Sequence, residues 1–254
     1  MKKITFTLVL ACLAGSMMGA KDVTRQSLAW YTGWLSVRFH PRWSWQSDFG
    51  NRIFMQPWAQ HQMFFRTHFR YHTTRYNTDF AVGFSVFGSS PNNPRAAHKL
   101  IVPELRPHLE AILRNEFSSF SLEHRFRAEA RFFHNTDTLR TTLTGGFTFS
   151  NFRFRYRLMA NIPIWKISEH RSLNGKIGNE IFINAGRDIV INIFDHNRIM
   201  ASLAFQVNKW MIWEAGYIYW YQLNENGTYF SRNIVSVTTH FIFNVRRCKS
   251  ASSP

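Results

Sequence analysis

Hydrophobic and polar residues alternate along much of the chain. In residues 122–132 (LEHRFRAEARF), the charged positions of one parity are Glu123, Arg125, Arg127, Glu129 and Arg131, and the other parity is almost entirely apolar. A β-strand directs successive side chains to opposite faces, whereas a helix, with a period of about 3.6 residues, would mix the two sets. The pattern predicts a strand with one charged face and one apolar face.

The same alternation recurs in segments spread over the whole chain. In 65–72, arginine and histidine oppose phenylalanine and tyrosine, and in 152–158, Arg153, Arg155 and Arg157 oppose an aromatic face. From this pattern and the intervening turn residues we expect about twelve strands. They lie at 27–39, 42–55, 60–73, 77–88, 99–114, 117–133, 138–149, 152–165, 176–186, 196–207, 210–223 and 229–245.

One pair of these segments predicts a tight hairpin. Apolar residues occupy odd positions in 139–149 and even positions in 152–158. A two-residue turn at Ser150 and Asn151 would pair Phe149 with Phe152 and would produce this change of parity, because paired residues face the same side. We therefore expect two strands here.

Periodicity alone does not tell which face points inwards. A soluble barrel has an apolar interior, whereas a membrane barrel turns its apolar face to lipid and has a polar lumen. Strands of this length can span a bilayer, which takes about 9–11 tilted residues. Tryptophans near strand ends are typical of an interfacial girdle, and here they are Trp30, Trp43, Trp45, Trp165, Trp210 and Trp220. The sequence favours an all-β fold, a transmembrane antiparallel up-and-down β-barrel of about twelve strands.

The N-terminal segment has the features of an export signal. Lys2 and Lys3 precede an apolar run over 4–13, and small residues end at Ala20. We predict a signal peptide over 1–20, an outer-membrane barrel over 21–245 and a basic, serine-containing tail over 246–254.

Charge composition raises the question of an anionic partner. Lysine and arginine number 31 against 15 acidic residues, a net charge of +16. The arginines alternate within strands instead of clustering in a surface patch, so we expect no nucleic-acid binding. Anionic lipid head groups or an anionic small solute are the partners that this charge favours.

The charged parity also defines a candidate lumen charge network. Its members are Glu104, Arg106, His108, Glu110, Glu123, Arg125, Arg127, Glu129, Arg131, Arg153, Arg155, Arg157, Glu180, Asp195 and Arg198. Buried charges need partners, and facing strands can supply them, so the first interpretation is structural packing that keeps the barrel closed. The second is a ligand or ion site. We expect Arg198 to pair with Asp195 or Glu180.

Motifs for other chemistry are missing from the sequence. His108 could serve as a general base beside Glu104 or Glu110, but no nucleophile accompanies it. No spacing typical of a metal site, a phosphate-binding loop or a dinucleotide fold occurs. We predict no catalytic residues, no metal ligands and no cofactor.

An ordered set of motifs resembles a known family. The motifs are PELRP at 103–107, LEHRFR at 122–127, FRYRLMANIPI at 154–164, NEIFINAG at 179–186, FDHNR at 194–198 and AFQVNK at 204–209. Together they resemble the family of outer-membrane β-barrel proteins designated domain of unknown function 2490, over about 27–245. The resemblance implies an outer membrane of Gram-negative type and no agreed activity.

These observations favour an integral outer-membrane protein that is not an enzyme. Its Arg/Glu-lined lumen would form a narrow pore or a ligand-binding barrel, and its partners would be outer-membrane lipid, the barrel assembly machinery and an anionic small solute. Two alternatives stay open. One is an outer-membrane lipid-modifying hydrolase, which a lipid-facing Ser–His–acid geometry would identify. The other is a secreted soluble ligand-binding β-barrel.

Overall fold

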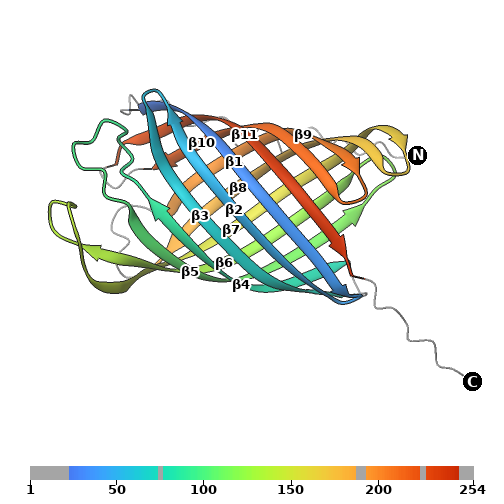
Figure 1. Ribbon diagram of the computed structural model, residues 1–254, viewed down its shortest axis with the longest axis horizontal. Helices are drawn as coiled ribbons and strands as arrows, with labels where there is room; N and C mark the ends of the chain where they lie inside the picture. Colours follow the sequence, from blue (N-terminus) through green and yellow to red (C-terminus); the bar gives the residue numbers. More distant parts are fainter. Residues whose placement is uncertain (1–22, 74–76, 187–192, 224–226, 246–254) are drawn as a thin grey trace, which may run out of the picture.

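The computed structural model describes residues 23–73, 77–186, 193–223 and 227–245. Within them lie eleven strands (Figure 1): β1 (Val23–His40), β2 (Trp43–Met55), β3 (Trp58–His72), β4 (Thr78–Ser89), β5 (Val102–Glu116), β6 (Ser121–Thr136), β7 (Leu143–Ser168), β8 (Arg171–Ala185), β9 (Phe194–Asn208), β10 (Met211–Leu223) and β11 (Tyr229–Asn244). The predicted signal peptide and C-terminal tail lie outside the described residues. No helix of the described part is long and apolar enough to cross a membrane.

The strands close into one barrel in which each strand pairs with its sequence neighbours. These pairs are antiparallel, whereas β1 and β11 pair in parallel, with Leu28 opposite Ile234. The all-β barrel is confirmed. The expected number of about twelve strands is corrected to eleven within the described residues. The expected fully antiparallel sheet is also corrected, because with an odd number of strands in alternating directions the first and the last run the same way and pair in parallel.

The difference in strand number comes from β7, which is continuous through the predicted hairpin. Arg131 pairs with Asn151 and Phe132 pairs with Phe149, so Ser150 is an extra residue without a counterpart on β6. Such a bulge shifts the parity of all later residues by one, as a two-residue turn does. Phe149 and Phe152 consequently point to the same side, with ring centroids 5.0 Å apart. The hairpin at Ser150 and Asn151 was wrong, although the parity change is real.

The barrel is polar inside and apolar outside. Phe126 is 48 % exposed on the outer surface, while its neighbour Arg127 is 3 % exposed inside. Phenylalanines are exposed on the outer surface of β2, β3, β4, β6 and β7, for example Phe49, Phe65, Phe80 and Phe154. The alternation in the sequence thus separates a charged lumen from an apolar outer face.

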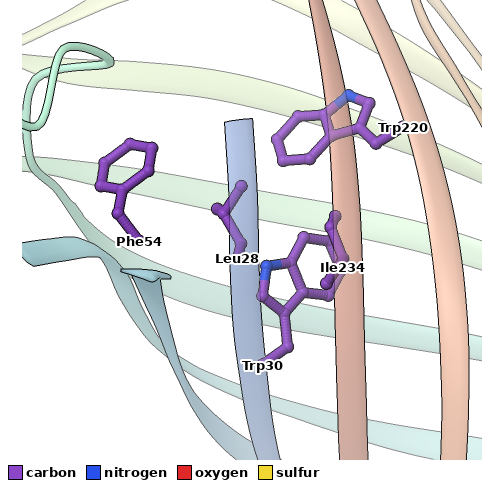
Figure 2. Close-up of a cluster of buried hydrophobic side chains, with 5 residues drawn as sticks. All are labelled: Leu28, Trp30, Phe54, Trp220 and Ile234. Atoms are coloured by element: carbon purple, nitrogen blue, oxygen red, sulfur yellow. The ribbon is translucent and has the colours of Figure 1, made fainter. Parts of the chain in front are cut away.

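Two tryptophans depart from the predicted girdle. Trp43, Trp165 and Trp210 are exposed near strand ends, but Trp30 and Trp220 are only 7 % and 5 % exposed. These two belong to a buried hydrophobic cluster with Leu28, Phe54 and Ile234 (Figure 2). Placing Trp30 and Trp220 in the girdle was wrong, because their rings pack against arginines inside the barrel.

The two ends of the barrel differ in their connections. At the end where β1 begins, the connections are 56–57, 90–101, 137–142, 186–193 and 224–228. At the opposite end they are 41–42, 73–77, 117–120, 169–170 and 209–210. We call these the long-connection end, on the left in Figure 1, and the short-connection end.

Candidate functional site

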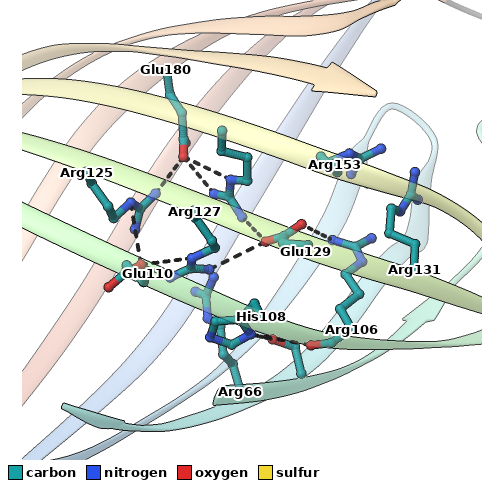
Figure 3. A network of polar contacts seen from close by, with 12 residues as sticks. Arg66, Arg106, His108, Glu110, Arg125, Arg127, Glu129, Arg131, Arg153 and Glu180 are labelled. Atoms are coloured by element: carbon teal, nitrogen blue, oxygen red, sulfur yellow. Dashed lines mark hydrogen bonds and ion pairs between the residues drawn. The ribbon is translucent and has the colours of Figure 1, made fainter. Parts of the chain in front are cut away.

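A network of ion pairs crosses the middle of the lumen (Figure 3). Its carboxylates come from β5, β6 and β8, and its guanidinium groups from β3, β6 and β7. We define this mid-lumen network by its members, Arg70, Glu110, Arg125, Arg127, Glu129, Arg155 and Glu180. All of them are buried.

Each carboxylate of the mid-lumen network binds more than one arginine. Glu110 accepts hydrogen bonds from Arg70, at 2.7 Å, and from Arg127. Arg155 donates to Glu129 at 2.7 Å and to Glu180 at 2.8 Å. The loss of one carboxylate would therefore remove a partner from at least two buried arginines at once.

Strand register explains why these carboxylates bridge. Arg127 on β6 lies directly opposite Arg155 on β7, and like charges placed in this way repel. Glu129, two residues along β6 on the same face, lies 3.7 Å from Arg127 and 2.7 Å from Arg155. Glu110 stands opposite Arg127 on the other side. Carboxylates thus interleave with arginines in two directions across the sheet.

The structure brings the predicted network residues together inside the lumen. Beyond the mid-lumen network, Glu104 pairs with Arg106 and Arg131, Glu123 pairs with Arg157, and Asp195 pairs with Arg153. His108 is buried, forms no ion pair with another described residue, and lies 3.4 Å from the hydroxyl of Ser85.

Arg198 is the exception, and its expected pairing was wrong. Glu180 is bound by Arg125 and Arg155, and Asp195 is bound by Arg153 and His196. Within the described residues, no carboxylate lies at ion-pair distance from Arg198. Its guanidinium instead lies over aromatic rings.

Sequence reasoning missed several lumen charges. Asp48 forms an ion pair with Arg66, Asp79 pairs with Arg114 at 2.8 Å, and Arg52 lies over the ring of Trp30. Asp48 and Arg52 share a parity with Ser44 and Gln46, which was the available signal. The signal is weak, because polar Ser47 and Asn51 interrupt the opposite parity.

Two cavities flank the mid-lumen network. A cavity of about 1020 Å³ at the long-connection end is lined by residues that include Arg52, His61, Arg198 and Trp220. A smaller one of about 370 Å³ at the short-connection end is lined by residues that include His72 and Asp79. No member of the mid-lumen network except Arg70 lines either cavity.

The smaller cavity contains a Ser–His–Asp arrangement. The Oγ of Ser44 lies 2.9 Å from Nε2 of His72, and Nδ1 of His72 lies 2.8 Å from Asp79. Nucleophile, base and orienting acid stand in this order in many hydrolases. Ser44 is, however, only 1 % exposed, and Arg114 also donates to Asp79. The three side chains face the lumen and not the apolar outer surface.

No cluster of histidine, cysteine and acidic residues suited to a metal ion occurs in the part of the chain that the structure describes.

Comparison with known proteins identifies a family but no characterised relative. A family model described as "Protein of unknown function (DUF2490)" matches residues 28–231. No curated protein and no solved structure matches the chain. The matched segment runs from β1 into β11 and includes the mid-lumen network and the lining of the larger cavity, whereas Ile242 and Asn244 of the smaller cavity lie beyond it.

The bridging role of Glu129 predicts a large loss of stability when it is removed. Glu129→Ala leaves Arg127 and Arg155 buried with fewer partners, and breaking a buried ion pair in this way costs about 3–5 kcal/mol. Thermal unfolding of the detergent-folded barrel, read from heat-modifiable gel mobility, measures the effect. Phe126→Tyr on the outer face is the control and should change stability by less than about 0.5 kcal/mol. A Glu129→Ala barrel as heat-resistant as the parent would contradict the bridging role.

Proposed function

The chain belongs to the family described as protein of unknown function DUF2490, and from this premise we propose that it is an integral outer-membrane β-barrel, blocked at mid-lumen, that binds a ligand instead of acting as an open pore. Outer-membrane lipid would surround the barrel, and the barrel assembly machinery would insert it. We propose no enzymatic activity as its main function.

The single observation that supports membrane insertion is the inverted polarity of the barrel. In water, the exposed phenylalanines of neighbouring strands β3 and β4, such as Phe65, Phe69 and Phe80, would form an apolar surface unusual for a soluble monomer. In a bilayer the same surface contacts acyl chains, and the closed barrel satisfies the backbone hydrogen bonds. Even the shortest strand, β4 with 12 residues, exceeds the about 9–11 residues that a tilted span needs.

Connection lengths support an orientation. Outer-membrane barrels have short periplasmic turns and longer extracellular loops. We place the long-connection end outside and the short-connection end in the periplasm. The larger cavity then opens towards the exterior, and the mid-lumen network lies between it and the periplasm.

Membrane extraction tests the proposal. We expect the protein in the outer-membrane fraction after treatment with high salt and with alkaline carbonate, since the apolar outer face would anchor it. A peripheral protein would be released by either treatment. Recovery in the soluble periplasmic fraction would refute membrane integration and favour a secreted soluble barrel.

Conductance tests whether the lumen is blocked. In planar bilayers we expect little current through the folded barrel, because buried Arg–Glu pairs occupy mid-lumen. Any residual current in a salt gradient should favour anions, since arginine rings select against cations. A large stable conductance, or clear cation selectivity, would contradict a blocked and basic lumen.

Hydrolysis of a small ester is a second candidate function, which the Ser44–His72–Asp79 arrangement favours. Since this arrangement lines the lumen cavity at the short-connection end, a water-soluble ester would suit it better than a bilayer lipid. His72 would take the proton of Ser44 as the hydroxyl attacks the ester carbonyl, and would give it to the alcohol that leaves when the ester C–O bond breaks. Water would then hydrolyse the acyl-serine with His72 again as the base, and Asp79 would orient the imidazole.

A fluorophosphonate probe tests this second candidate. If Ser44 is an activated nucleophile, the probe should label the folded protein covalently, and Ser44→Ala should abolish the label. Ser36→Ala is the matched control, because Ser36 lines the same cavity without contacting His72. Absence of labelling in the folded parent would refute the hydrolase.

A further inference from the structure

Three arginines at the long-connection end differ from the other lumen arginines. Arg52 on β2, Arg198 on β9 and Arg232 on β11 have no carboxylate at ion-pair distance among the described residues. Arg52 donates to the amide of Gln62, and Arg232 donates to Gln26, Gln222 and Asn92. Arg198 makes no side-chain hydrogen bond within the described part of the chain. Among the described residues, no carboxylate pairs with any of the three, and their guanidinium groups lie over the shared rings of Trp30 and Trp220.

Aromatic rings hold these guanidinium groups in place. That of Arg198 lies 4.5 Å from the ring centroid of Trp220, 4.6 Å from that of Phe182 and 5.1 Å from that of Trp30. Arg52 lies 4.0 Å from Trp30. Figure 2 shows that Trp30 and Trp220 both project into the lumen. Cation–π contacts stabilise a guanidinium but leave its charge and its N–H donors available.

Several buried donors in this cluster have no acceptor among the residues that the structure describes. They are the Nε groups of Arg52 and Arg198 and the indole Nε1 groups of Trp30 and Trp220. Arginine and tryptophan side chains can only donate hydrogen bonds. Arg198 is 8 % exposed and lines the larger cavity. Buried donors normally have acceptors, and the positive charges around these donors favour an acceptor that carries negative charge.

The larger cavity has room for such a group. Its volume of about 1020 Å³ is at the upper end of the range of about 300–1,000 Å³ that is typical of ligand pockets. Its carboxylates do not compete for Arg198, because Glu104 is bound by Arg106 and Arg131, and Asp195 by Arg153. Apolar side chains complete the wall, namely Phe133, Leu139, Phe194 and Leu223.

We propose that this cavity binds an organic oxyanion, a phosphate or carboxylate attached to an apolar group, with its charged oxygens on Arg198 and Arg52 and its apolar part against Phe133 and Leu139. The planar guanidinium fork matches the oxygens of both groups. The inference rests on the proposed function, because it names the ligand class of the binding barrel. Arg232 adds positive potential behind the site.

Calorimetric titration of the full chain, folded in a nonionic detergent, tests the site. Phenyl phosphate should bind saturably and raise the unfolding temperature, because a ligand that binds only the folded state stabilises it. Inorganic phosphate should bind more weakly, since it lacks the apolar part. No saturable binding of either probe, or of the lipid below, would overturn the proposal.

Variants assign the binding to Arg198. Arg198→Gln should weaken phenyl phosphate binding at least about tenfold, the loss expected for a charge-assisted hydrogen bond. Arg198→Lys keeps the positive charge but lacks the planar guanidinium group, so its affinity for phenyl phosphate should lie between that of Arg198→Gln and that of the parent. It also serves as the second variant if the glutamine form does not fold. Equal affinity of parent and both variants would overturn the assignment.

Arg157→Gln is the matched control. It removes a lumen arginine that lines neither cavity, and its partner Glu123 keeps Arg114 at 3.4 Å. The affinity for phenyl phosphate should stay within about twofold of the parent. A loss as large as that of Arg198→Gln would show that only the net charge of the lumen matters and would overturn the site.

A titration with lipid distinguishes the two sources of the anion, a lipid headgroup and a free solute. Titration with mixed micelles containing phosphatidylglycerol tests a lipid headgroup, and phenyl phosphate tests a free solute. Binding of either that depends on Arg198 supports the site and names its source. Carbonate extraction tests membrane integration independently of these titrations. If the protein is released as a soluble protein but binds phenyl phosphate, membrane integration is refuted and the binding site is not. If it stays in the membrane but binds neither probe, the binding site is refuted and membrane integration is not.

Discussion

Charge neutralisation inside a closed lumen is the constraint on which this barrel depends. An arginine directed into the interior loses much of its hydration and must meet a carboxylate from another strand. Because the side chains of a strand alternate, a slip by one residue would expel a charged row to the apolar surface. Pairs such as Glu110 opposite Arg127 exist in only one register. The ion pairs therefore specify how the strands align as well as how the lumen is filled.

Charge is not neutralised evenly along the barrel axis. At mid-lumen, carboxylates bridge the arginines, whereas at the long-connection end aromatic rings take the place of carboxylates around Arg198. The lumen thus combines a neutralised middle with a basic chamber. In the function proposed above, the arginines bridged by carboxylates fill the middle of the barrel, and the arginines packed against aromatic rings are those that we propose to bind a ligand.

Alternation predicted the strands and the separation of a charged face from an apolar one, because both follow from side chains pointing to alternate sides. The interior position of the charged rows was predicted from strand length and from the tryptophans near strand ends. Alternation could not distinguish a bulge at Ser150 from a hairpin, since both invert parity and only long-range pairing with β6 differs. It also assigned Trp30 and Trp220 by their place along a strand, although both lie inside. The pairing of Arg198 failed for a related reason. Glu180 lies opposite Arg198 in the sheet, but Arg125 and Arg155 already bind its carboxylate, and the sequence does not show which of several arginines a carboxylate binds.

The parallel contact between β1 and β11 has a consequence for the chain as a whole. An odd number of strands places Val23 and Asn244 at opposite rims of the barrel. The seam also joins residues from the two extremes of the chain, such as Leu28 and Ile234. Contacts between residues so distant in sequence carry the largest loop-closure entropy, so this seam is the most demanding step of folding and is expected to form last. Pairing of β1 with β11 is thus the step that closes a curved, open sheet into a barrel.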